Sequence, residues 1–252
     1  MRLASISVAP VKGTRLVHPR AVNVDRHGLT DDRKFHVVAV DGRAQLGATK
    51  SALLQVVSRW DARTEVLALT FPDGRVVEER IELGPDVTAR VTWDGNRAVL
   101  GRCLVGPWSD ALSEHLQMPV VLACPTAPRR AVDVGPVTLV SRATIKALGL
   151  DDGVGDPARF RLNLLLDGPD AFAEDAWDGR RVRLGDAVLK VGGAVPRCAA
   201  VNSDPVTGAR DPRVLKAVAA REPVGGVKAP LGVYATVEQP GRIGAGDALT
   251  LL

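Results

Sequence analysis

The sequence predicts a mainly β protein with a few helices (α+β). The 252 residues include 25 Gly and 17 Pro but only 4% aromatic residues, a composition that favours many turns and small aliphatic packing over a long helical bundle. Short β-branched segments recur between Gly, Asp, Asn and Pro, as strands and turns do. With 46% apolar residues, the chain has enough material to bury a core.

In the first half, strands are expected at 3–8 and 34–40, the second followed by an Asp41-Gly42 turn. The segments 66–71 and 76–83 flank Asp73-Gly74, which predicts two antiparallel strands joined by a tight turn that needs a positive φ. Asp94-Gly95 is interpreted as another such turn.

A helix is expected at 108–117, with apolar residues at helical spacing, Ser109 as its N-cap and Pro119 beyond its end. The strand 120–123 follows. The loop PTAPRRAVDVGP then shifts in composition between two prolines, which predicts a seam. We therefore divide the chain into residues 1–125 and 126–252.

The second part opens with a strand at 137–140 and a short helix that Ser141 caps and Gly149 ends. A further helix is expected near 213–220. The remaining segments are short and bounded by Gly, Pro or Asp, and we expect strands at 160–166, 182–184, 187–191, 233–237 and 248–251.

Charge and cysteine usage exclude several classes of protein. Lys and Arg outnumber Asp and Glu by only 33 to 29 and are interspersed with them, so nucleic acid is not expected as a partner. The N-terminus lacks the continuous apolar segment of a signal peptide, and no apolar run is long enough to span a membrane. Three widely separated cysteines give no disulfide framework, which favours the reducing cytoplasm.

The segment RFRLN is the first candidate site. Read as a strand, it places Arg159, Arg161 and Asn163 on one face. Two guanidinium groups and an amide on that face suit bidentate contact with phosphate. The alternative interpretation is a half-buried strand with a solvated polar face.

The segment AVPRC is the second candidate. Pro196 and Gly192-Gly193 predict a rigid loop that places Arg197 beside Cys198. A neighbouring cation favours the thiolate, which is both a nucleophile and a soft metal ligand. The alternative is a cysteine that serves as a small buried hydrophobic residue.

Two glycine-containing segments near the N-terminus form the weakest candidate. PVKG and GLTDDRKF place Lys12 and Arg33 near Gly13 and Gly28, so backbone amides and cations could approach an anion together. Plain surface turns are the alternative, because no phosphate-binding loop motif is present. The four histidines have no metal-ligand spacing and are expected to be structural or exposed.

Taken together, the segments resemble the MOSC (molybdenum cofactor sulfurase C-terminal) family, with its N-terminal β-barrel region preceding the MOSC domain. The resemblance covers nearly the whole chain and rests on the motifs PVKG, GLTDDRKFHVV, LVSRATI, RFRLNLLLDG, FAEDAWDG, RVRLGD, VPRC, DPVTG and LGVYATVEQPGRIGAGDALTLL. It implies a β-barrel-like MOSC domain packed on an N-terminal β-barrel.

The resemblance also implies a site for the molybdenum cofactor, a pterin dithiolene with a phosphate tail, in a cleft between the two parts. Cys198 matches the essential cysteine of the family and would be the protein's ligand to molybdenum. The residues that would hold the pterin and phosphate are Lys12, Arg33, Ser141, Arg159, Arg161 and Asn163, with Arg197 beside the thiol. Asp175 and Asp204 match recurrent family acids, and we expect hydrogen-bonding or turn roles for both.

The mitochondrial amidoxime-reducing members of the family imply reduction of small N-hydroxylated (N-oxygenated) compounds, with the cofactor supplying the redox chemistry. Pro196 and Gly13 stand where those members carry hydroxyl residues. Without the cysteine spacing of an iron–sulfur domain, electrons are expected from a separate ferredoxin or flavoprotein. The alternatives are a sulfur carrier with a persulfide on Cys198 and a cofactor chaperone or storage protein.

Overall fold

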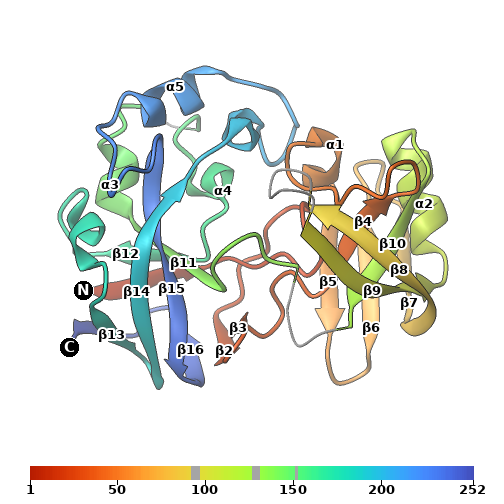
Figure 1. The fold of residues 1–252 in the computed structure, drawn as a ribbon, viewed down its shortest axis with the longest axis horizontal. Coiled ribbons are helices and arrows are strands. Elements are labelled where there is room, and N and C mark those ends of the chain that lie inside the picture. Colours follow the sequence, from red (N-terminus) through yellow and green to blue (C-terminus); the bar gives the residue numbers. More distant parts are fainter. Residues whose placement is uncertain (92–96, 127–130, 151–152) are drawn as a thin grey trace.

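The structure is a computed structural model that describes residues 1–91, 97–126, 131–150 and 153–252. Two lobes lie side by side, one around a seven-stranded sheet and one containing two smaller sheets and the helices α1 and α2 (Figure 1). The predicted class, mainly β with a few helices, is confirmed.

The first lobe is built on a sheet that nearly closes into a barrel. Its strands, in spatial order, are β1 (Arg2–Ile6), β12 (Leu164–Asp167), β11 (Val137–Ser141), β15 (Pro230–Gln239), β14 (Ala187–Pro196), β13 (Arg181–Leu184) and β17 (Leu249–Leu251). An antiparallel bridge between Arg2 and Ala248 brings the two edge strands together, and the Leu249 amide donates to the Met1 carbonyl at 2.9 Å. Alternating aliphatic side chains of these strands fill the interior.

The second lobe contains a four-stranded and a three-stranded sheet. The four-stranded sheet has the order β4 (His36–Ala39), β10 (Val120–Pro125), β9 (Arg97–Val105) and β8 (Glu82–Val91). The other consists of β5 (Val57–Asp61), β6 (Val66–Thr70) and β7 (Val76–Arg80). The helices are α1 (Ser51–Leu54) and α2 (Trp108–Leu116). Trp108 is fully buried in this lobe's core, where its indole N–H donates to the Leu67 carbonyl at 3.0 Å.

N-terminal strands cross into the C-terminal half of the fold. Besides β1, the strand β2 (Ala21–Asp25) pairs with β16 (Gly241–Gly244) on one side and β3 (Gly28–Leu29) on the other. Side chains of all three N-terminal strands enter the barrel core. The division of the chain at 125/126 stays a prediction, because strands from before residue 126 share one core with strands from after it.

Short helices cover the upper part of the first lobe in Figure 1. They are α3 (Arg142–Lys146), α4 (Pro157–Phe160) and α5 (Arg213–Ala219). The same half of the chain also forms the 3-10 turns η1 (Ala173–Trp177) and η2 (Ala199–Asn202). Apolar residues of α3, α4, η2 and α5 share one core cluster. Within the described ranges, no helix has both the length and the apolar character needed to cross a membrane.

Most predicted elements are confirmed. The 66–70 and 76–80 strands pair antiparallel around Gly74, whose φ is +86°. Ser141 caps α3 by accepting from the Thr144 amide at 3.0 Å. The expected turn at Asp94-Gly95 lies outside the described residues.

Three local predictions are wrong. The segment 157–160 is a helical turn, begun by Asp156 as N-cap and Pro157, and β12 starts only at Leu164. Pro107 rather than Ser109 occupies the N-cap of α2, and the Ser109 hydroxyl instead accepts from the Leu122 amide.

The third concerns Gly192-Gly193 and Pro196, which were expected in a loop. They lie inside strand β14, and the pairing register with β15 shifts between Val191 and Ala194. The paired glycines therefore mark a β-bulge.

Candidate functional site

Four basic side chains come together between the lobes from segments far apart in the sequence. Lys12 follows β1, Arg33 precedes β4, Arg161 ends α4 and Arg197 follows β14. The electrostatic influence of Arg33 reaches the other three. We call these four residues the cation cluster.

Backbone geometry holds the arginines in place. Arg33 and Arg161 both have left-handed conformations, with φ of 50° and 52°, which turn the chain sharply at each position. An Arg33 Nη2–H donates to the Arg161 carbonyl at 3.4 Å, and Arg197 donates to the Phe160 carbonyl. The connection from α4 to β12 is thus held by two members of the cation cluster.

Two acidic residues partly compensate the cation cluster. Asp32, which is 1% exposed, accepts from the guanidinium of Arg33, the side-chain amide of Asn163 and the backbone amide of Ala9. Asp133 pairs with Lys12. Counting only these groups, four positive charges face two negative ones, which leaves an excess positive charge.

Burial of this excess charge is reflected in the pKa values. Burial and the neighbouring Arg33 lower the pKa of Arg161 to about 9. Burial also lowers the pKa of Lys12 and of Arg197. Nη1 of Arg161 and Nε of Arg197 are buried and have no hydrogen-bond partner within the described part of the chain. Such donors, together with the excess positive charge, suit an anionic ligand.

The thiol of Cys198 lies beside this cluster. Cys198 follows Arg197 directly, occupies the N-cap position of η2 and is exposed. Cys103, Cys124 and Cys198 are all free thiols. Among the described residues, no group of three or more His, Cys, Asp or Glu side chains is placed to bind a metal.

Asn163 contacts the cation cluster through Asp32, the acid that pairs with Arg33. Its Oδ1 accepts from the amide and hydroxyl of Thr138, and its Nδ2 donates to the Ser7 carbonyl and to Asp32. These four bonds use its full hydrogen-bonding capacity. Direct contact of Asn163 with a cofactor stays a prediction, and its observed contacts orient the acid that pairs with Arg33.

Ser141 is fully buried and bonds with the amide and hydroxyl of Thr144. Its cofactor contact also stays a prediction, while its cap role is observed.

Arg159 does not share a face with Arg161, contrary to the strand interpretation. Its side chain is 6% exposed, pairs with Asp204 at 2.8 Å and donates to the Asn202 carbonyl at 3.3 Å. In a strand, residues two apart share a face, but Arg159 lies in a helical turn, so it and Arg161 point in different directions. Arg159 therefore contacts the segment after Cys198, and its cofactor contact stays a prediction.

The two family acids have the hydrogen-bonding roles expected for them. Asp204 Oδ1 accepts from the amides of Val206 and Thr207 at 2.9 and 2.8 Å, which forms a tight turn. Asp175 pairs with Arg221.

Sequence reasoning missed three participants in the site. Two of them are the acids Asp32 and Asp133 described above. The third is Tyr234 on β15: burial raises its pKa, and nearby Arg197 partly offsets that rise. The buried pairing of Asp32 with Arg33 could have been suspected from the adjacent charges in TDDRK. No local signal marks Asp133 or Tyr234, since their place depends on the pairing of distant strands.

His36 lies near Lys12 and is fully buried, and neither of its ring nitrogens has a partner in the described structure. Burial and Lys12 lower its pKa to about 4. It is therefore a neutral structural histidine at physiological pH, in agreement with the sequence prediction.

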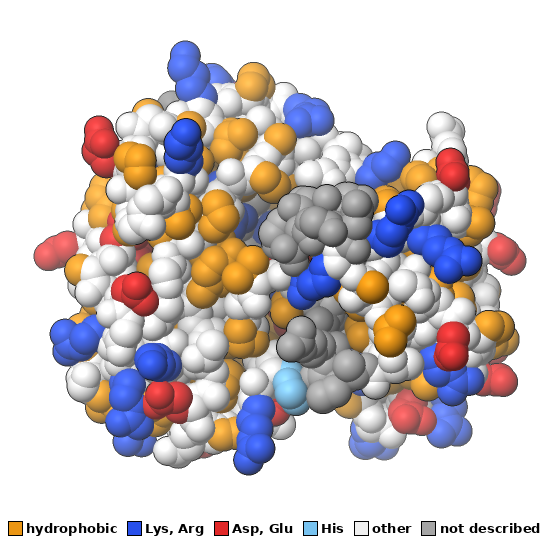
Figure 2. All heavy atoms as spheres, in the orientation of Figure 1, with side chains coloured by type: hydrophobic (Ala, Val, Ile, Leu, Met, Phe, Trp, Pro, Cys, Tyr) orange, Lys and Arg blue, Asp and Glu red, His pale blue; other side chains and the backbone are white. Residues whose placement is uncertain are grey.

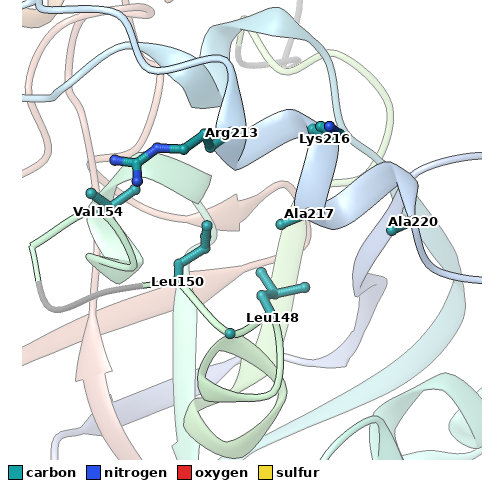
Figure 3. Close-up of a pocket in the computed structure, with 8 residues that line it drawn as sticks. Leu148, Leu150, Val154, Arg213, Lys216, Ala217 and Ala220 are labelled. Atoms are coloured by element: carbon teal, nitrogen blue, oxygen red, sulfur yellow. The ribbon is translucent and has the colours of Figure 1, made fainter.

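A separate hollow of about 330 Å³ lies between α5 and the chain after α3. Figure 3 shows apolar side chains, among them Leu148 and Leu150, facing the helix, with Arg213 and Lys216 at the rim. No residue of the cation cluster lines it. On the surface, Lys and Arg side chains lie beside the boundary between the lobes (Figure 2).

Comparison with known proteins matches two domains. Residues 1–99 match the MOSC N-terminal beta barrel domain, and residues 128–250 match the MOSC domain. The chain is 35% identical over 130 residues to mitochondrial amidoxime-reducing component 1 of Homo sapiens, an alignment that covers 48% of this chain and 38% of the human protein.

It is 32% identical over 128 residues to mitochondrial amidoxime reducing component 2 of Rattus norvegicus, covering 46% and 36% of the two chains. The alignments thus span well under two thirds of each relative. Among solved structures, the YUAD protein from Bacillus subtilis aligns with a TM-score of 0.47 and 13% identity, over 99% of this chain and 94% of that one.

Proposed function

Because the chain belongs to the MOSC family, we propose that it is a molybdenum cofactor-binding oxidoreductase that reduces N-hydroxylated compounds. Two relatives are named for amidoxime reduction. The observation that carries the proposal for this chain is the cation cluster, with its excess positive charge next to the exposed thiol of Cys198.

The residues present fit such a cofactor. A phosphate monoester needs several cationic donors, and the cluster offers four, with unpartnered nitrogens on Arg161 and Arg197. A metal that carries a dithiolene needs few protein ligands, and a thiolate is a suitable soft one. Lys12, Arg33, Arg161 and Arg197 would hold the phosphate and pterin, and Cys198 would bind the metal.

When bound, the molybdenum cofactor supplies two-electron redox chemistry at its metal. An N-hydroxylated substrate gains two electrons and two protons, its N–O bond breaks, and the oxygen leaves as water. The chain's own part is to bind and orient. The cations hold the anionic group, and the Asp32–Arg33 pair, braced by Asn163, fixes the direction of the donors.

The proposal includes a small N-oxygenated substrate, a separate ferredoxin or flavoprotein as electron donor, and a cytoplasmic location. Neither nucleic acid nor a membrane is proposed as a partner. The three free thiols are compatible with a reducing compartment.

A sulfur carrier is the second candidate, because the Cys198 thiol is exposed as sulfur transfer requires. Such a carrier would bear a removable persulfide and no molybdenum. The cation cluster favours the reductase, since a persulfide alone needs no four-cation site.

The test is molybdenum content and benzamidoxime reduction with an artificial electron donor, after production in a host that makes the cofactor. We expect near-equimolar molybdenum in the wild type and loss of metal and activity in Cys198→Ala, with Cys124→Ala as the matched control. An Arg33→Ala, Arg161→Ala double variant should also lose metal. A wild type without molybdenum but with sulfur on Cys198 would replace the reductase by the carrier.

A further inference from the structure

Arg15 joins the two lobes at the loop that follows the Cys198 segment. Arg15 lies three residues after Lys12, and its backbone amide donates to the Val56 carbonyl at 2.8 Å. Its Nε and Nη2 donate to the carbonyls of Pro205 and Val206, each at 3.0 Å. Longer contacts of 3.5 and 3.4 Å reach the carbonyls of Leu54 and Gln55 at the end of α1. The guanidinium thus bridges α1 and the loop 204–208.

Gln55 extends this contact by one residue. Its Nε2 donates to the Thr207 carbonyl at 2.5 Å, so three consecutive carbonyls of the loop are bound by side chains of the other lobe. Gly208 lies against the same amide. A Cβ at 208 would stand 2.8 Å from Gln55 Nε2, at a backbone φ of +74°. A side chain at 208 would therefore displace the Gln55 amide and would be strained at this positive φ.

The loop itself is preformed. The Asp204 carboxylate accepts from two loop amides, and the amide of Gly208 donates to the Asp204 carbonyl at 2.9 Å. Its carbonyls are thereby presented in a fixed arrangement. Pro205 is buried, which anchors the loop further.

The loop connects directly to the thiol segment. Cys198 begins η2, which ends at Asn202, two residues before Asp204. Arg159 binds the short link between η2 and the loop at two points, the Asn202 carbonyl and the Asp204 carboxylate. A contact at 205–207 therefore constrains the backbone that carries Cys198.

We propose that Arg15 and Gln55 are positioning residues that clasp the carbonyls of Pro205, Val206 and Thr207 and so hold the Cys198 segment against the cation cluster. This inference rests on the proposed function, in which Cys198 binds a cofactor that the cluster also holds. The clasp ties the thiol from one lobe to Lys12 and Arg33 from the other, because Lys12 and Arg15 share one short segment.

The experiment compares the wild type with Arg15→Ala, Arg15→Lys and Gln55→Ala, and with Gly208→Ala, which perturbs the clasp from the loop side. Arg59→Ala is the control, since Arg59 is exposed on β5. Hydrogen exchange of the loop amides reports opening of the clasp. Molybdenum remaining after gel filtration of the holoprotein reports its effect on the site. The alkylation rate of Cys198 by iodoacetamide, in a Cys103→Ala, Cys124→Ala background without cofactor, reports the thiol segment independently.

We expect Arg15→Ala to speed exchange at residues 206–208 by about tenfold, as loss of two hydrogen bonds implies. Molybdenum retention should fall. The alkylation rate of Cys198, which is already exposed, should change about threefold, because the segment is no longer held beside the cations of the cluster. Arg15→Lys should fall between wild type and Arg15→Ala, since an ammonium replaces only part of the fork. Gln55→Ala and Gly208→Ala should shift the same readouts, and Arg59→Ala none.

Unchanged loop exchange in all clasp variants would overturn the proposal. Faster exchange with wild-type molybdenum retention and wild-type alkylation would also overturn it, because the clasp would then be structural only. If Arg15→Ala failed to fold, Gln55→Ala and Gly208→Ala would decide. If the wild type carried no molybdenum, the proposed function would fail, and alkylation alone would decide whether the clasp positions Cys198.

Discussion

Single residues at the site are held in conditions that an ordinary folded core avoids. Arg161 keeps a guanidinium whose pKa is lowered to about 9, with a nitrogen that has no partner among the described residues. Arg33 donates a hydrogen bond to the backbone carbonyl of Arg161. Burial of a charged donor without a partner costs stability, and charged groups perturbed in this way are common at binding sites.

His36 allows a pH test at the same scale. Its folded-state pKa is about 4, against 6.5 for the free side chain. Above pH 6.5 the histidine is neutral in both states and carries no penalty. As the pH falls from 6.5 towards 4, only the unfolded state takes up the proton, so stability is lost in this window with a slope approaching about 1.4 kcal/mol per pH unit.

We therefore expect His36→Leu to flatten the pH dependence of the urea midpoint between pH 6.5 and 4. His27→Leu is the control, because His27 is exposed. Identical pH profiles for wild type and His36→Leu would contradict the assignment.

The elements were predictable where a local signal fixes them. Alternation around Asp73-Gly74 predicted the β6–β7 hairpin, and Ser141 predicted the start of α3. The strand predicted from residue 159 onward is wrong at its start, and a local signal could have shown this, since Asp156-Pro157 is itself a helix-start signal. The sequence at Gly192-Gly193 predicts a loop, because a bulge inside a long strand has the same local composition.

Replacing Ser141 by alanine tests the cap. The change removes an acceptor for the Thr144 amide and a partner for its hydroxyl in a fully buried place. We expect a loss of about 1 to 2 kcal/mol in the free energy of unfolding, measured by urea denaturation. Ser51→Ala is the matched control, because Ser51 begins α1, where no side chain caps the helix. Equal stability of the two variants would show that the Ser141 cap does not stabilise α3.

At the scale of the whole molecule, sequence reasoning predicted the class but not the interleaving. That β1 lies between β12 and the last strand, and that β2 pairs with β16, depends on contacts more than 150 residues apart. The same holds for the cation cluster. Lys12, Arg33, Arg161 and Cys198 were found through motifs, whereas Asp133 and Tyr234 depend on which strands become neighbours.

This interleaving predicts the behaviour of fragments. Residues 126–252 alone lack β1, β2 and β3, whose side chains fill part of the barrel core. We expect that fragment to show no cooperative thermal transition, and a fragment of residues 1–30 added to it to restore one in part. The intact chain is the reference for circular dichroism melting curves. A cooperative transition of 126–252 by itself would mean that the N-terminal strands are dispensable.

The bridge between Arg2 and Ala248 also orders events during synthesis. The first strand leaves the ribosome long before its neighbour, because Arg2 bridges a residue as far along the chain as Ala248. Until then β1 is a nascent strand with an unpaired edge, which is open to association with other chains. The barrel can close only after residues 248–251 have been made, so a pause in translation before that point would prolong the interval in which the nascent chain depends on chaperones.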